Sequence, residues 1–130
     1  MAAVREVRAL FTSFEDSSAA PAEPVSAEVE QAFAALPRSV RATFVRFTLE
    51  ELATLAPGNS VEVRVPPLGV TQCVAGPRHT RGTPPSVVET SPVVWAALVL
   101  GVCSWEQAVA AGVLDASGER SDLSTLLPLF

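Results

Sequence analysis

The chain has 130 residues, a formal net charge of −5 and 48% hydrophobic residues. A chain of this length can fold as one domain without a disulfide or a metal ion. The negative charge argues against nucleic acid and against an anionic membrane surface as partners. The longest apolar run, from Val93 to Leu100, is too short for stable membrane insertion. The high apolar content therefore predicts an unusually full core, or apolar surface that lines a cavity or covers a partner.

The start of the chain and its cysteines predict a compartment. Residues 1–16 contain Glu6 and no uninterrupted apolar core, so we expect no secretory signal and a cytoplasmic location. Cys73 and Cys103 have no metal-like spacing, and we expect both thiols to stay apart and reduced. The sequence predicts neither a metal nor a cofactor, because it has a single histidine, His79, and no clustered ligands.

The N-terminal part reads as an extension of the main domain. Val4, Val7, Phe11 and Phe14 recur at helical spacing, which predicts an amphipathic helix over residues 3–16. A linker rich in Pro, Ala and Ser follows. We therefore divide the chain into an extension, residues 1–25, and a domain, residues 26–130. The helix is expected to pack on the domain, with a mobile lid over a ligand or a dimer contact as alternatives.

The domain is predicted to alternate helices and short strands. Ser26 caps a short helix that stops at Pro37, and a mostly buried helix runs from Arg38 to about Ala56. Alternating valines predict a half-buried strand over 61–65, paired through a Pro-Pro turn with an antiparallel strand over 70–75. A short strand over 87–89 comes next.

The C-terminal third carries its own start and stop signals. Ser91 caps a helix that Gly101 closes, and Ser104 with Gln107 forms a capping box for a second helix. A strand over 113–117 is followed by a last helix, which Ser121 caps, which carries Leu123, Leu126 and Leu127 on one face, and which Pro128 stops. The fold class is therefore α+β, a small mostly antiparallel sheet packed against several helices.

No set of residues has the spacing of a catalytic site. Cys73 and His79 could form a thiolate and base pair, but no third group supports them, so we expect no enzymatic activity. Arg78, His79 and Arg81 lie close together with two threonine hydroxyls, and such a loop can bind a phosphate, carboxylate or sulfate. The alternative is an exposed loop whose arginines pair with nearby carboxylates such as Glu89.

Several segments of the sequence resemble those of a known protein family. The run SPVVWAALVLGVCSWEQAVAAGVLDASGERSDLSTLLPLF resembles the C-terminal part of sterol carrier protein type-2 domains, and the segments PGNSVEVRVPP and QCVAGPRHTRGTPPSVVET resemble their bacterial branch. The positions that carry the pattern are Trp95, Gly101, Ala108, Gly112, Gly118 and Leu126 to Leu129. The resemblance covers roughly residues 38–130. It implies a sheet on one side of several helices, enclosing an apolar tunnel for fatty acyl, sterol or other lipid-like molecules.

The resulting hypothesis is non-enzymatic binding or carriage of a lipid-like ligand in an apolar pocket, with an anionic head group at the Arg78 to Arg81 loop. The expected pocket lining is Val61, Val63, Val65, Trp95, Leu98, Leu126 and Leu127. One alternative is a protein-interaction or homodimerisation module. Another is a stand-alone relative of the accessory domain of thiol-dependent maleylpyruvate isomerase-like proteins, whose catalytic metal lies on a separate domain with several histidines.

Overall fold

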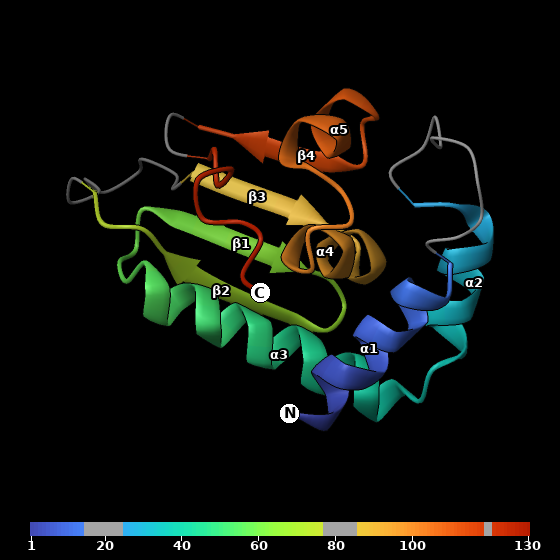
Figure 1. Ribbon diagram of the computed structural model, residues 1–130. Coiled ribbons are helices and arrows are strands. Elements are labelled where there is room, and N and C mark those ends of the chain that lie inside the picture. The colour runs from blue at the N-terminus through green and yellow to red at the C-terminus, as the bar shows by residue number, and fades with distance from the viewer. Residues whose placement is uncertain (15–24, 77–85, 119–120) are drawn as a thin grey trace.

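The chain folds into a four-stranded sheet and five helices (Figure 1). The computed structural model describes residues 1–14, 25–76, 86–118 and 121–130. The helices are α1 (Ala2–Ser13), α2 (Ala27–Ala35), α3 (Arg38–Leu55), α4 (Pro92–Val99) and α5 (Trp105–Ala110). The strands are β1 (Val61–Val65), β2 (Gly69–Cys73), β3 (Ser86–Thr90) and β4 (Leu114–Ser117). The predicted α+β class with an N-terminal helix is confirmed.

The sheet is mixed. Its strand order is β2-β1-β3-β4, with antiparallel pairs at both edges and a parallel pair, β1 with β3, in the middle. The chain reverses between β1 and β2 and again before β3, so β3 runs in the direction of β1 and lies beside it. Two of the three strand pairings are antiparallel, as the sequence predicts. The sequence did not predict the parallel pairing of β1 with β3.

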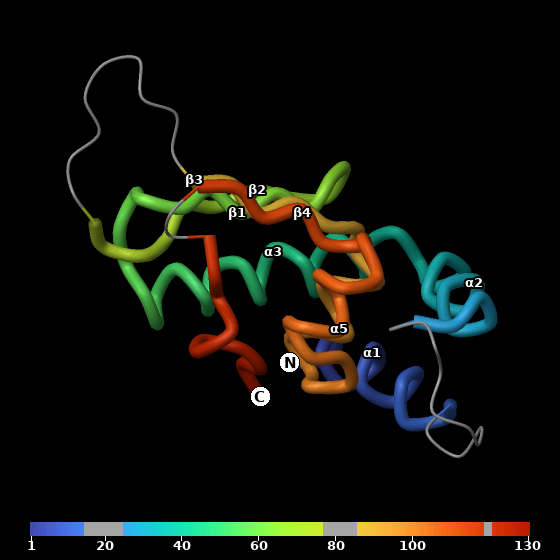
Figure 2. Tube along the Cα trace, turned by 90° about the horizontal axis from the view of Figure 1, so that it is seen from above, coloured from blue at the N-terminus to red at the C-terminus, as the bar shows by residue number. Residues whose placement is uncertain are grey.

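The two faces of the sheet differ in chemistry. Val61, Val63 and Val65 of β1 are completely buried, whereas Glu62 is half-buried and Arg64 is exposed. Figure 2 shows every helix on one side of the sheet, and no described helix covers the other side. The strict alternation in β1 is therefore confirmed, and burial of each valine on the helix side contributes roughly 1.5–3 kcal/mol.

The helical layer packs in order against the sheet. Helix α3 lies along β2 and contacts α4, and both helices supply fully buried side chains to one core. Helix α1 packs on α3 and α2 through Ala3, Val4, Val7 and Phe11, which are all buried. Of the arrangements expected for this helix, the structure has the one in which it packs on the domain.

Three predicted helix starts are confirmed by their hydrogen bonds. The hydroxyl of Ser26 accepts from the backbone N–H of Val29 in α2, and the hydroxyl of Ser91 accepts from that of Val94 in α4. At α5, Ser104 and Gln107 exchange both bonds of a capping box. These caps satisfy helix donors locally, which explains why a few residues of sequence are enough to locate them.

The predicted last helix is wrong. Residues 121–130, which we call the strap, form one turn at Ser124–Leu126 and otherwise have no regular secondary structure. The hydroxyl of Ser121 donates to Gly118 O, and the carboxylate of Asp122 accepts from the backbone N–H of Ser124. These local bonds compete with helix formation, and the few residues before Pro128 are too few to nucleate a helix.

Among the helices that the structure describes, none has both the length and the apolar character needed to cross a membrane.

Candidate functional site

The strap closes the helix side of the sheet over the core. Its anchor is Leu123, which is completely buried. The backbone N–H of Leu129 donates to Val99 O at the end of α4 over 3.0 Å, and the ring of Phe130 stacks on Phe47 of α3 with centroids 6.4 Å apart. Figure 2 shows the strap on the same side of the sheet as the helices. It is therefore held at both ends and spans the space between them.

A cavity of about 320 Å³ lies between the strap and the corner that joins α4 to α5. Its apolar lining includes Leu98 of α4, Trp105 of α5 and Leu127 of the strap. Its polar lining comes from the first turn of α5 and from Ser124. The sulfur of Cys103, which also lines it, donates to Ser104 O over 3.3 Å. The cavity is apolar at the core side and polar at the rim.

Gly101 brings the strap close to this corner. Its φ of +77° closes α4, and a Cβ placed on it would lie 3.3 Å from Cγ of Pro128. A side chain at position 101 would therefore strain the turn and push against the strap.

The structure brings two of the predicted lining residues into one cavity, Leu98 and Leu127. Leu126 lies half-buried beside them in the strap. Val61, Val63, Val65 and Trp95 are completely buried in the layer between sheet and helices, and they line neither of the two hollows described in this section. Their contact with a ligand stays a prediction.

The indole of Trp95 is also tied to the helix beside it. Its Nε1 donates to the hydroxyl of Thr48 over 2.8 Å, and both residues are fully buried. Trp95 therefore joins α4 to α3 whether or not a ligand reaches it.

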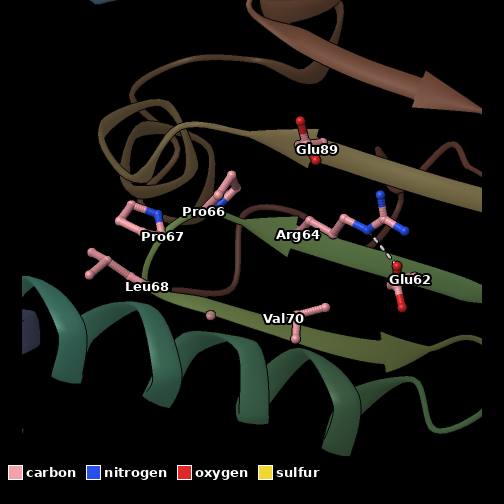
Figure 3. Close-up of a pocket in the computed structure, with 8 residues that line it drawn as sticks. Glu62, Arg64, Pro66, Pro67, Leu68, Val70 and Glu89 are labelled. Atoms are coloured by element: carbon pink, nitrogen blue, oxygen red, sulfur yellow. Dashed lines mark hydrogen bonds and ion pairs between the residues drawn. The ribbon is translucent and has the colours of Figure 1, made fainter.

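A different hollow lies on the uncovered face of the sheet (Figure 3). It has a volume of about 520 Å³ and is walled by the Pro66 and Pro67 turn and by Val70. Its floor carries charge, because Glu62 and Arg64 form an ion pair there and Glu89 lies beside them. A charged floor suits polar groups, so this groove is a poor site for an acyl chain.

The predicted anion-binding residues, Arg78, His79 and Arg81, lie outside the described residues. Their alternative partner, Glu89, is exposed on β3 and pairs in register with Arg64 and Asp115 of the neighbouring strands. The anion site therefore stays a prediction.

The cysteines have the state that the sequence predicts, since both are free and buried. Burial raises the pKa of the Cys73 thiol from 9.0 to about 11 and also raises the pKa of Cys103. A thiol with a raised pKa carries little thiolate near neutral pH, which weakens the Cys73 and His79 hypothesis from the cysteine side.

Metal ligands do not gather in the described part of the chain, where no three His, Cys, Asp or Glu side chains come together. The sequence reasoning also missed most of the cavity lining, including Gly101, Cys103, Trp105 and Ser124. The Gly101 stop signal and the Ser104 capping box marked the corner that supplies three of them. Ser124 gave no comparable signal, because its place depends on the strap.

The described part of the chain combines a sheet that has its helices on one side, an apolar layer between sheet and helices, and a cavity under the strap. The chain matches the family described as bacterial SCP ortholog, in which SCP stands for sterol carrier protein, over residues 37–129. It belongs to this family, and the predicted resemblance is confirmed. No curated protein matches the chain.

Proposed function

We propose that this protein binds and carries a lipid-like ligand without catalysing a reaction, and that the ligand occupies the space under the strap. The observation that carries the proposal is the meeting of Leu98 and Leu127 in one cavity that the strap closes. Family membership supports a lipid-carrier type of domain. The raised pKa of the Cys73 thiol supports a non-enzymatic role, because that thiol is a weak nucleophile near neutral pH.

The size of the cavity specifies how a ligand fits. About 320 Å³ lies near the lower end of small-molecule sites, which span roughly 300–1,000 Å³. The cavity alone therefore takes one end of an acyl chain. A longer chain displaces the half-buried leucines of the strap, Leu126 and Leu127, and reaches the apolar core against which they pack. Each buried CH₂ contributes about 0.8 kcal/mol, so affinity rises with chain length.

The residues at the rim of the cavity disfavour an anionic head group there, so we expect the head group to lie outside the cavity. The side chains of Ser104 and Gln107 already bond to the start of α5, and Glu106 adds a carboxylate that repels an anion. A fatty acid would therefore enter with its methyl end first. We propose that its carboxylate is held at Arg78, His79 and Arg81. Arg81→Ala should then weaken the binding of a fatty acid but not of the matching alcohol, and equal loss for both would contradict this head-group site.

We propose a cytoplasmic location for the carrier, because its two cysteines are free and buried. A second candidate function, a homodimerisation module, is favoured by exposed valines near the cavity, Val102 and Val109, which are 45% and 47% exposed. Mass measured by light scattering over a dilution series tests it. A concentration-dependent dimer that Val109→Asp dissociates would support this candidate, and a monomer at every concentration would exclude it.

Native mass spectrometry of freshly purified protein, followed by titration with a fluorescent fatty acid, tests the carrier proposal. We expect a co-purifying mass that organic extraction removes, and saturable binding by the extracted protein. Leu127→Asp should abolish binding, because it puts a charge into the cavity. The matched control is Val70→Asp, at a residue 60% exposed on the other face of the sheet, which should bind normally. A folded wild-type protein that binds no fatty acid would contradict the proposal.

A further inference from the structure

A second cavity lies where the N-terminal part of the chain meets the family domain. It has a volume of about 450 Å³ and is distinct from the cavity under the strap, with which it shares no lining residue. Val25 and Glu30 line it from the start of α2. Both precede residue 37, where the family match begins. This cavity is therefore composite, and residues that precede the family match supply one of its walls.

The opposite wall is apolar and well fixed. Val93 and Val94 at the start of α4 are only 6% and 5% exposed, and Val113 lies beside them. The backbone of Val113 is held on both sides, since its N–H donates to Ala108 O and its C=O accepts from the hydroxyl of Thr90. On the α2 side, the Ser26 cap fixes the first turn of the helix. The cavity is thus preformed.

Two polar side chains break the apolar lining, Glu30 and Ser91. Among the residues that the structure describes, the only ion pair is between Arg64 and Glu62, so the carboxylate of Glu30 has no cation of its own there. Glu30 lies in the first turn of α2. An ionised carboxylate only accepts hydrogen bonds, so it selects a ligand that donates them.

Ser91 adds a second polar contact. Its hydroxyl oxygen accepts a hydrogen bond of 3.4 Å from Val94 N, which uses only part of its capacity. The oxygen keeps one lone pair that can accept a further N–H. Glu30 and Ser91 both line the cavity and are both exposed, so each offers an acceptor to a ligand that donates hydrogen bonds.

We propose that this cavity binds a primary or secondary amine that carries a compact apolar group. The ammonium pairs with Glu30 and donates to Ser91, and the apolar group packs on Val93, Val94 and Val113. The site is independent of the lipid-like ligand under the strap. It would be present in relatives only where an extension supplies a carboxylate at this place.

The test is an amide chemical-shift titration of the full chain with three probes of one shape, cyclohexylamine, cyclohexanol and cyclohexane carboxylate. With the amine we expect saturable amide shifts at Val25, Val93, Val94 and Val113. The alcohol should bind with at least tenfold lower affinity, and the carboxylate should cause no shifts. Raising the salt concentration should weaken binding of the amine. An alcohol that binds as tightly as the amine, or shifts confined to other residues, would overturn the proposal.

Matched variants separate the charge from the cavity and this site from the lipid site. Glu30→Gln should reduce affinity for cyclohexylamine at least tenfold. Glu28→Gln, two residues earlier in the same helix turn and outside the lining, should leave it unchanged. Glu30→Gln should also keep full binding of a fluorescent fatty acid, and Leu127→Asp should keep full binding of the amine. Equal amine affinity in Glu30→Gln and wild type would overturn the assignment of Glu30.

Discussion

The indole Nε1 of Trp95 donates a 2.8 Å hydrogen bond to the hydroxyl of Thr48, which joins α4 to α3 inside the core. The same hydroxyl lies within hydrogen-bond distance of Phe44 O and Val45 O, one turn earlier in α3. Both side chains are fully buried, so neither can replace its partner with water. The bond therefore fixes α4 relative to α3, the helix that lies along β2.

Thr48→Val tests this bond with little change of shape. The valine leaves the buried indole N–H without an acceptor, so we expect the free energy of unfolding to fall by about 1–3 kcal/mol in urea denaturation. Thr54→Val, at an exposed position of the same helix, should stay within about 0.5 kcal/mol of wild type. In combination with Trp95→Phe, the loss should be smaller than the sum of the single losses. Strict additivity would show that the two side chains do not interact.

Gly101→Ala and Gly112→Ala form a matched pair that reports on the strap. Both glycines have positive φ, +77° and +73°, so each substitution should cost about 1–2 kcal/mol of backbone strain. Only the Cβ at position 101 meets Pro128, since nothing lies within 4 Å of a Cβ at position 112. We expect Gly101→Ala alone to speed hydrogen exchange of the Leu129 amide. Equal exchange in the two variants would contradict the described contact.

The stability of the protein should fall between pH 9 and pH 11. The pKa of Cys73 is raised by burial from 9.0 to about 11, so over this interval the unfolded thiol loses its proton while the folded thiol keeps it. This stability is fully present below about pH 9 and is lost as the pH rises through the folded pKa, by about 2 kcal/mol. The chain contains no Tyr, and its basic residues are all Arg, so few other groups titrate there.

Urea denaturation at a series of pH values measures this loss, and Cys73→Ala should reduce it to the part that comes from Cys103, whose pKa burial also raises. Both thiols should also react slowly with a thiol reagent at pH 8 in the folded protein and rapidly in urea, because both are buried. A Cys73 that reacts at the rate of a free thiol in the folded state would contradict the buried, protonated thiol.

Phe130→Ala should loosen the strap at its end. Loss of the stack on Phe47 removes roughly 0.5–1.5 kcal/mol, so a ligand held under the strap should dissociate about 2–10 times faster. Stopped-flow displacement of a bound fluorescent fatty acid measures the rate. Leu55→Ala, which truncates another exposed apolar side chain at the end of α3, should leave the rate unchanged. Equal rates in both variants would show that Phe130 does not hold the ligand in.

The sequence predicted the elements whose causes are local. Ser26, Ser91 and Ser104 locate three helix starts through bonds to residues three positions away, and the alternating residues of β1 identify its two faces. The sequence could not predict the parallel pairing of β1 with β3, because that pairing depends on where the chain rejoins the sheet after β2.

The strap shows the same limit. Its leucine spacing suggested a helix, but it is held by distant partners, Val99 and Phe47, that no local pattern reveals. The sequence predicted only part of the cavity lining, for the same reason. Leu98 and Leu127 could be named as apolar residues of a family pattern, whereas the contribution of Ser124 follows only from how the strap lies.

Photolabelling with a photoactivatable fatty acid tests the central claim most directly. Trypsin cleaves after Arg, so it places Leu98 and Trp105 in the peptide 82–120, the strap in 121–130, and the Pro-Pro turn of the outer groove in 65–78. We predict adducts on 82–120 and 121–130 that an unlabelled fatty acid competes away, and their loss in Leu127→Asp. Adducts confined to 65–78, or labelling that no competitor reduces, would contradict a ligand site under the strap.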